Sequence, residues 1–166
     1  MKSIPERDAA QTHGALHAVS QGPKSTPAGS SPPPQPRPDP DSAGFWKHSG
    51  EGRLSLQQCA SCSRWQFPPL ETCRHCNGPL SWQPVSGRGT VYSFIVQQHG
   101  VAPGFDGLRP YVIALVSPEE APHVRLPSRL LDADPAQVRI GAPVEAVVIP
   151  LPGGDLRVPV FRLVRD

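Results

Sequence analysis

Hydrophobic residues are distributed unevenly along the chain. Residues 1–44 contain nine prolines and no aromatic residue, and their only Val, Ile or Leu side chains are Ile4, Leu16 and Val19. Such a segment buries too little apolar surface to offset the entropy lost on ordering. We therefore expect a disordered Pro/Ser-rich tail over residues 1–44, followed by a folded region that holds all ten aromatic residues.

A short helix is predicted at the start of the folded region. Asp41 or Ser42 can cap its N-terminus, and the glycines within residues 50–52 would end it within about two turns. A helix of this length is not stable alone, so Phe45 and Trp46 must pack on the same domain or on a partner protein. The sequence leaves these two options open.

The region after the helix has the patterning of short β-strands. Extended segments flank the two pairs of cysteines, at residues 54–58, 63–69 and 79–85. The clearest two-residue alternation follows at residues 89–97. It places Tyr92, Phe94 and Val96 on one face of a strand and Val91 and Ile95 on the other.

Four more strands are predicted beyond residue 109. Residues 110–117 are a nearly continuous apolar run, typical of a central strand. Residues 123–131 alternate, with Pro127 indicating an edge or a bulge. The last two strands, PVEAVVIP and LRVPVFRLV, form a hairpin around the turn at residues 152–155.

The connections between these strands differ in kind. Residues 98–109 are turn-rich and predict a long loop, whereas residues 132–144 predict a short helical turn. Asp134 would be its N-cap, Pro135 its first residue and Gly141 its end. Five short antiparallel strands are the number expected of a small OB-type barrel, although other small barrels share this count.

All four cysteines lie within eighteen residues, as Cys59, Cys62, Cys73 and Cys76. A CxxC turn directs two sulfurs to one side, and two such turns provide the four thiolates of a closed, structural Zn²⁺ site. Iron accepts the same ligands, so a rubredoxin-like electron carrier is an alternative. Disulfides require an oxidising compartment that nothing in the sequence indicates, and a thioredoxin-like centre requires one CxxC at the start of a helix.

Charge and hydropathy narrow the functional class. The formal net charge is +2 at pH 7, without the basic stripe typical of nucleic-acid-binding proteins. No apolar run approaches the roughly 20 residues of a membrane helix, and the N-terminus lacks the apolar core of a secretory signal. We therefore expect a soluble, cytoplasmic protein with no membrane partner.

The sequence contains no catalytic motif that we recognise. It has no GxSxG elbow, P-loop, GxGxxG after a strand or HExxH pair. His75 lies inside the second cysteine pair, but four thiols already complete a metal shell, so we expect this histidine to face solvent. Binding or scaffolding is therefore a better functional class than catalysis.

Several stretches together carry a family resemblance: FWKHSGEGRLSLQQCASCSRWQFPPLETCRHC, VSGRGTVYSFIV, PYVIALV and QVRIGAPVEAVV. From about Phe45 to Phe161 the chain resembles the zinc-ribbon plus OB-fold acyl-CoA-associated proteins, long catalogued as domain of unknown function thirty-five. The resemblance implies a mainly β fold. A short helix and a rubredoxin-like zinc ribbon would occupy residues 45–84, and a five-stranded OB-fold barrel residues 85–166.

The resemblance also implies a function. It indicates a non-catalytic accessory subunit that associates with a thiolase-like enzyme, an aldolase or an enoyl-CoA hydratase and helps bind acyl-CoA in lipid, steroid or polyketide-type metabolism. By similarity, the ligands of a structural Zn²⁺ are Cys59, Cys62, Cys73 and Cys76. The residues expected to face the partner or the acyl-CoA are Phe45, Trp46, His99, Phe105 and Arg109.

The chain departs from the family pattern at several positions. The family often has Gly directly after each CxxC, where this chain has Ser63 and Asn77, although Asn tolerates a left-handed backbone. It often has Asn at Arg129 and Gly-Cys near Asp132 and Ala133, so we carry over no ligand contact there.

A single-stranded nucleic-acid-binding module is the alternative function. Small barrels and zinc ribbons both bind single strands with aromatic platforms and a basic groove. Tyr92, Phe94, Arg88 and Arg125 would take these roles. We favour core and surface positions for them, because alternating aromatic residues in a strand more often pack than stack on bases.

Overall fold

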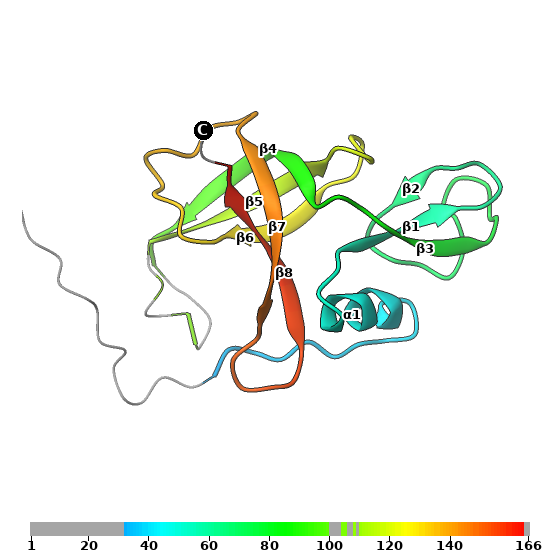
Figure 1. Cartoon of the computed structure of the whole chain (residues 1–166), viewed down its shortest axis with the longest axis horizontal. Coiled ribbons are helices and arrows are strands. Elements are labelled where there is room, and N and C mark those ends of the chain that lie inside the picture. Colours follow the sequence, from blue (N-terminus) through cyan, green and yellow to red (C-terminus); the bar gives the residue numbers. More distant parts are fainter. Residues whose placement is uncertain (1–31, 100–103, 106–107, 109, 165–166) are drawn as a thin grey trace, which may run out of the picture.

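The computed structural model of the chain describes residues 32–99, 104–105, 108 and 110–164. Their elements are α1 (Ala43–Gly50), β1 (Ser55–Cys59), β2 (Trp65–Gln66), β3 (Leu80–Pro84), β4 (Arg88–Gln97), β5 (Tyr111–Pro118), β6 (Leu126–Leu130), β7 (Pro143–Pro150) and β8 (Arg157–Leu163). The ribbon sheet, β2-β1-β3, lies beside the barrel, and α1 lies below the place where they meet (Figure 1). With eight residues, α1 is far too short to cross a bilayer, and the described part of the chain has no longer helix.

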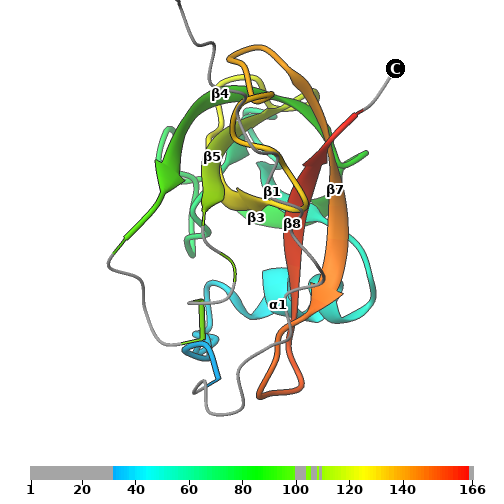
Figure 2. The same ribbon diagram turned by 90° about the vertical axis from the view of Figure 1, so that its left-hand side faces the viewer.

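Five strands close into a barrel in the order β4-β5-β6-β8-β7. Neighbouring strands are antiparallel except β6 and β8, which pair in parallel at Leu130 and Phe161. Figure 2 shows the strands curving around a common centre. Pro127 pairs with Leu115 of β5 and has no partner on β8, because β6 and β8 pair only at Leu130, so the locally unpaired side agrees with the predicted edge or bulge. A closed five-stranded barrel after a short helix and a ribbon confirms the predicted fold class.

One hydrophobic core joins the ribbon to the barrel. The barrel contributes Val112 and Phe161, which are 0% and 2% exposed, and the ribbon contributes Leu56, which is 0% exposed. Trp65 and Phe67 pack against the same cluster from the ribbon side. Because the two parts share their core, the ribbon is a fixed extension of the barrel.

The helix α1 docks by close packing. The Phe45 ring packs on the core with its centroid 6.3 Å from that of Phe67, and Trp46 lies edge-on to Phe45 at 5.2 Å. Gly44 lies against the indole of Trp82, where a Cβ would be 2.1 Å from Nε1. The helix therefore packs on its own domain, one of the two options that the sequence left open.

The N-terminus of α1 differs in detail from its prediction. Ser42 occupies the N-cap position, but its side chain makes no cap hydrogen bond to the first turn. Its N–H instead donates to Asp39 Oδ1 at 2.7 Å. This hydrogen bond therefore stabilises the turn that precedes the helix and does not cap the first turn of the helix.

A β-bulge in β4 changes the predicted faces of this strand. The register with β5 shifts between Val91 and Ser93, which interrupts the two-residue alternation. As a result Tyr92 and Ile95 are 51% and 58% exposed, whereas Val91 is buried and Phe94 packs on the core. The predicted grouping of Tyr92 with Phe94, and of Val91 with Ile95, is wrong because alternation carries no mark of an inserted residue.

Residues 132–142 form a series of turns without a helix, and the predicted helical turn is limited to one hydrogen-bonded turn at residues 134–137. Asp134 does cap locally, since its Oδ1 accepts from the Ala136 N–H and its carbonyl from the Gln137 N–H, both at 2.9 Å. The chain then turns inward to bury Val138, which is 1% exposed, and ends the turns at Gly141 with a φ of 85°.

The predicted tail is described only in its last part. Residues 32–39 lie outside helices and strands, with Pro33 buried, and Gln35 Nε2 donates to the Pro152 carbonyl in the β7–β8 turn at 2.9 Å. This part of the predicted tail packs on the barrel. Residues 1–31 lie outside the described residues.

Candidate metal centre

Two backbone turns of the same construction carry the four cysteines. The Ser63 N–H donates to the Cys59 carbonyl at 2.9 Å, and the Asn77 N–H donates to the Cys73 carbonyl at 2.8 Å. Ser63 and Asn77 both have a left-handed backbone, with φ of 58° and 56°. The resemblance described above implies Gly at both positions, so the turn keeps its shape here with less permissive residues.

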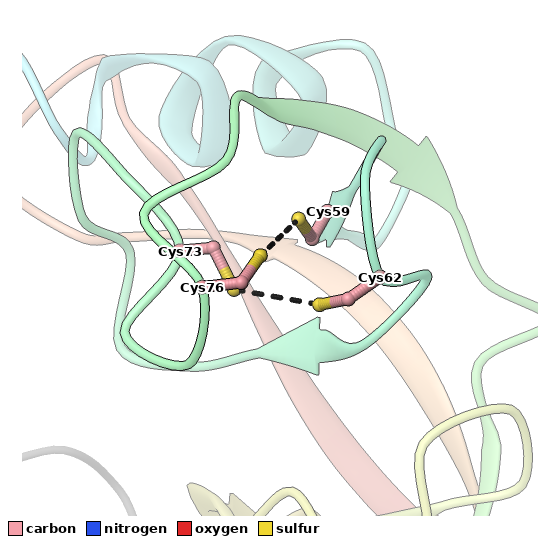
Figure 3. A group of neighbouring side chains, drawn as sticks. All are labelled: Cys59, Cys62, Cys73 and Cys76. Atoms are coloured by element: carbon pink, nitrogen blue, oxygen red, sulfur yellow. Dashed lines mark hydrogen bonds between the residues drawn. The ribbon is translucent and has the colours of Figure 1, made fainter.

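The two turns direct their sulfurs toward one another (Figure 3). The four Sγ atoms, of Cys59, Cys62, Cys73 and Cys76, lie within 4.8 Å of one another. The Cys59–Cys76 and Cys62–Cys73 separations are 3.5 and 3.7 Å. Four thiolates at about 2.3 Å from a tetrahedral Zn²⁺ are about 3.8 Å apart. The ribbon is therefore suited to binding a zinc ion.

Backbone N–H groups favour the thiolate form at two of these cysteines. The N–H of Cys62 lowers the pKa of Cys59 to about 6. The N–H of His75, 3.4 Å from the Cys73 sulfur, lowers the pKa of Cys73 below its usual value. The His75 side chain is exposed and is not a member of the four-residue group, in agreement with its predicted solvent-facing position.

The pKa of Cys76 is shifted in the opposite direction, toward the protonated thiol. The Gly78 N–H favours its thiolate, but the neighbouring thiols of Cys59 and Cys62 outweigh this donor and raise the pKa of Cys76 to about 12. A divalent cation replaces the proton of such a thiol and neutralises the crowded negative charge. The group therefore has the chemistry of a metal centre, which is complete only with a cation.

Two buried glutamines fix the loop that leads to the second turn. Gln57, 6% exposed, donates from Nε2 to the Leu70 carbonyl and accepts at Oε1 from the Leu70 N–H, both at 2.9 Å. Gln66, 4% exposed, accepts from the Arg74 N–H at 3.0 Å. Sequence reasoning missed both residues, because glutamine in a short strand is more often exposed. Their only signal was their place in the segments beside the first cysteine pair.

Gly78 allows the two turns to approach each other. A Cβ at this position would lie 2.5 Å from Ser61 Oγ and 3.1 Å from the Cys59 sulfur. The second turn therefore requires the residue without a side chain at the point where it faces the first.

The residues predicted to contact a partner or acyl-CoA lie on separate elements. Phe45 and Trp46 belong to α1 and are partly exposed. His99, just after β4, is exposed, and the ring centroid of Phe105 lies 6.0 Å from that of Tyr111. Arg109 lies outside the described residues.

Two hollows contain none of these predicted contact residues. A cavity of about 230 Å³ at the ribbon–barrel junction is lined by Trp65, Gln66, Phe67, Arg74, His123, Val124 and Arg125. In its wall His123 Nε2 lies 2.9 Å from the Trp65 carbonyl, which links barrel to ribbon. A second hollow, of about 690 Å³, is lined by residues of the β6–β7 connection and of β7 and β8, among them Asp132 and Arg162.

Comparison with known proteins agrees with this architecture. Residues 46–80 match the family described as ChsH2, rubredoxin-like zinc ribbon domain, and residues 82–148 match the family described as ChsH2, C-terminal OB-fold domain. A solved structure described as the Ltp2-ChsH2(DUF35) aldolase superposes with a TM-score of 0.70 at 34% identity, covering 78% of this chain and 98% of that chain.

Two relatives define the extent of the similarity. The chain is 39% identical over 116 residues to the 3-oxo-4,17-pregnadiene-20-carboxyl-CoA hydratase alpha subunit of Mycobacterium tuberculosis, covering 70% of this chain but only 36% of that protein. It is 33% identical over 105 residues to a DUF35 domain-containing scaffold protein of Methanocaldococcus jannaschii, covering 61% of this chain and 72% of that protein. The four-thiol ribbon, the barrel and these similarities establish that the chain belongs to the DUF35 family of zinc-ribbon and OB-fold proteins.

Proposed function

We propose that this chain is a non-catalytic accessory subunit that binds a CoA-thioester enzyme of the hydratase, aldolase or thiolase type and helps bind its acyl-CoA. The observation that carries the proposal is a four-thiol ribbon sharing one core with an OB-fold barrel. Support comes from relatives that are named a scaffold protein and a hydratase alpha subunit. The metabolic setting would be lipid, steroid or polyketide-type.

In this proposal the four cysteines hold a structural Zn²⁺ that stabilises the ribbon. A shell of four thiolates leaves no position for substrate, so the ion supplies folding energy and no Lewis-acid chemistry. The shared core then transmits the rigidity of the ribbon to α1 and the barrel.

The proposed contacts with the partner or the acyl-CoA are at α1 and at the β4–β5 loop. Trp46 is only partly covered by its own domain, and His99 is exposed. Phe105 and Arg109 belong to the same proposed set. We also retain as proposals the domain division at residues 44 and 84 and the cytoplasmic location.

The test is co-expression of the full chain with a CoA-thioester hydratase, aldolase or thiolase from the same organism. We expect the two proteins to co-elute, with one zinc per chain by elemental analysis and no visible absorbance. We expect the isolated chain to leave the enzyme's acyl-CoA substrate unchanged.

Three results would contradict the proposal in different ways. Separate elution of two monodisperse, fully active proteins would remove the accessory role. A coloured protein containing iron would support the electron-transfer alternative. Turnover of the thioester by the isolated chain would show that it is an enzyme.

A further inference from the structure

The outer face of the barrel carries an apolar patch on β4, β5 and β6. We define the outer patch as Tyr92, Ile95, Ile113, Leu115 and Pro127. Ile95 lies opposite Ile113, and Leu115 lies opposite Pro127, so these side chains point to the same side of the sheet. Tyr92, Ile95 and Leu115 are 51%, 58% and 37% exposed.

The patch arises because β5 is apolar on both faces. Its inward residues Val112, Ala114 and Val116 are 0% exposed, and its outward positions include Ile113 and Leu115. The outward face of an antiparallel barrel strand is ordinarily polar, because water covers it. Contiguous exposed apolar side chains mark an interaction surface.

Arginines lie at two margins of the outer patch. Arg129 is the cross-strand neighbour of Ile113, and the Arg125 guanidinium lies 3.7 Å from the centroid of the Tyr92 ring. Arg125 is held there, since its Nη1 donates to Ser117 Oγ at 3.1 Å. Among the described residues no carboxylate oxygen lies within 4 Å of either arginine. An Asp or Glu side chain on a partner surface would therefore complement the charge of these two arginines.

The composition of the patch discriminates among occupants. Residues 1–31 contain only Ile4, Leu16 and Val19 as large aliphatic residues and no aromatic residue, so this segment offers little to bury there. Nucleic-acid bases stack on exposed aromatic faces, whereas the patch is mainly aliphatic and Arg125 covers its Tyr92 ring. An apolar protein surface is the better complement.

We propose that the outer patch binds a partner protein whose surface has an apolar centre flanked by Asp or Glu side chains. This inference rests on the proposed function, and it assigns the contact to the CoA-thioester enzyme. The patch borders Tyr111, which contacts Phe105 of the β4–β5 loop, so it extends the contact set already proposed. Apolar burial would provide affinity, and the two arginines would orient the partner.

The experiment compares two identical substitutions on the full, zinc-loaded chain. Ile95→Lys places a charge in the patch, whereas Ile140→Lys places one at a 72% exposed isoleucine outside it. Affinity for the enzyme that co-elutes with the wild type is measured by calorimetry. We expect Ile95→Lys to weaken binding by about tenfold or more and Ile140→Lys by less than about twofold. Arg129→Glu tests the rim, and its loss of affinity should diminish as salt rises.

Each outcome has a distinct meaning. If both lysine variants bind like the wild type, the outer patch is not the interface, although the accessory role stands. If the wild type binds no CoA-thioester enzyme, the proposed function and this inference both fail. A wild-type homodimer that Ile95→Lys dissociates, or affinity for single-stranded DNA that this substitution abolishes, would also overturn the inference. Unchanged melting temperature and zinc content exclude misfolding as the cause of weakened binding.

Discussion

A substitution at Gln57 should lower the zinc affinity of the metal centre without changing any of its cysteines. The substitution Gln57→Leu keeps the side-chain volume close to that of glutamine but removes both hydrogen bonds to the Leu70 backbone. The loop that leads to Cys73 then loses its anchor on β1. We expect the four-thiol group to be less well organised before the metal binds.

The magnitude follows from the two lost hydrogen bonds. Leaving a buried polar group without its partner costs about 1–3 kcal/mol. Leu70 is only half-buried, so water compensates in part and we take the lower end for its N–H and its carbonyl. Together these give about 2 kcal/mol, and because folding of the ribbon is coupled to metal binding, this corresponds to roughly 30-fold weaker zinc affinity.

The assay is competition for zinc with a chromophoric chelator, with the neighbouring Gln58→Leu as the matched control. Gln58 donates a single exposed hydrogen bond, to the Ser63 carbonyl at 3.1 Å, so its loss should change the affinity by less than about threefold. Equal affinities for the two variants would refute the reasoning, because the buried pair of hydrogen bonds would then contribute nothing beyond an exposed one.

Two further predictions concern the same centre. Zinc must displace the proton of Cys76, whose pKa is about 12, so zinc affinity should rise with pH near neutrality and fall more steeply below about pH 6, where Cys59 is also protonated. Calorimetry in buffers of different ionisation enthalpy measures the protons released on binding. A zinc affinity that does not change with pH would contradict this prediction. Gly78→Ala should weaken zinc binding because its methyl group would press on Ser61, whereas Gly50→Ala, which meets nothing within 4 Å, should bind zinc normally.

The cysteine group and the sequence of strands were predictable because chemistry or periodicity fixes them locally. Tetrahedral coordination dictates both the ligand type and the CxxC spacing, so the approach of Cys59 and Cys76 to 3.5 Å agrees with an expectation from the sequence. A nearly continuous apolar run likewise predicted β5, and the turn residues 152–155 predicted the β7–β8 hairpin, which is closed by the Leu151 N–H donating to the Leu156 carbonyl at 2.9 Å.

Other features depended on contacts between segments that are far apart in the sequence. Gln57 and Leu70 are thirteen residues apart, and no local sequence pattern predicts the two hydrogen bonds between them. The bulge at Tyr92 arises from the register between β4 and β5, which hydrophobic alternation within one strand cannot specify. Burial of Val138 in the core competes with continuation of the turn at Asp134, and the core contact prevails.

The strand β5 has an apolar pattern that packing within its own chain explains only in part. Its apolar run predicted a central strand, and within the chain it does have a neighbour along each edge, β4 and β6. Only one of its faces is covered, however, since Val112 and Val116 are 0% exposed while Leu115 is 37% exposed. Aliphatic side chains on the outer face of an isolated barrel leave apolar surface in water, so they stabilise the fold much less than the same side chains would in the core. With the proposed partner bound, the two faces of β5 would lie in two apolar environments, the core on one side and the partner surface on the other, and the Ile95→Lys experiment tests the second.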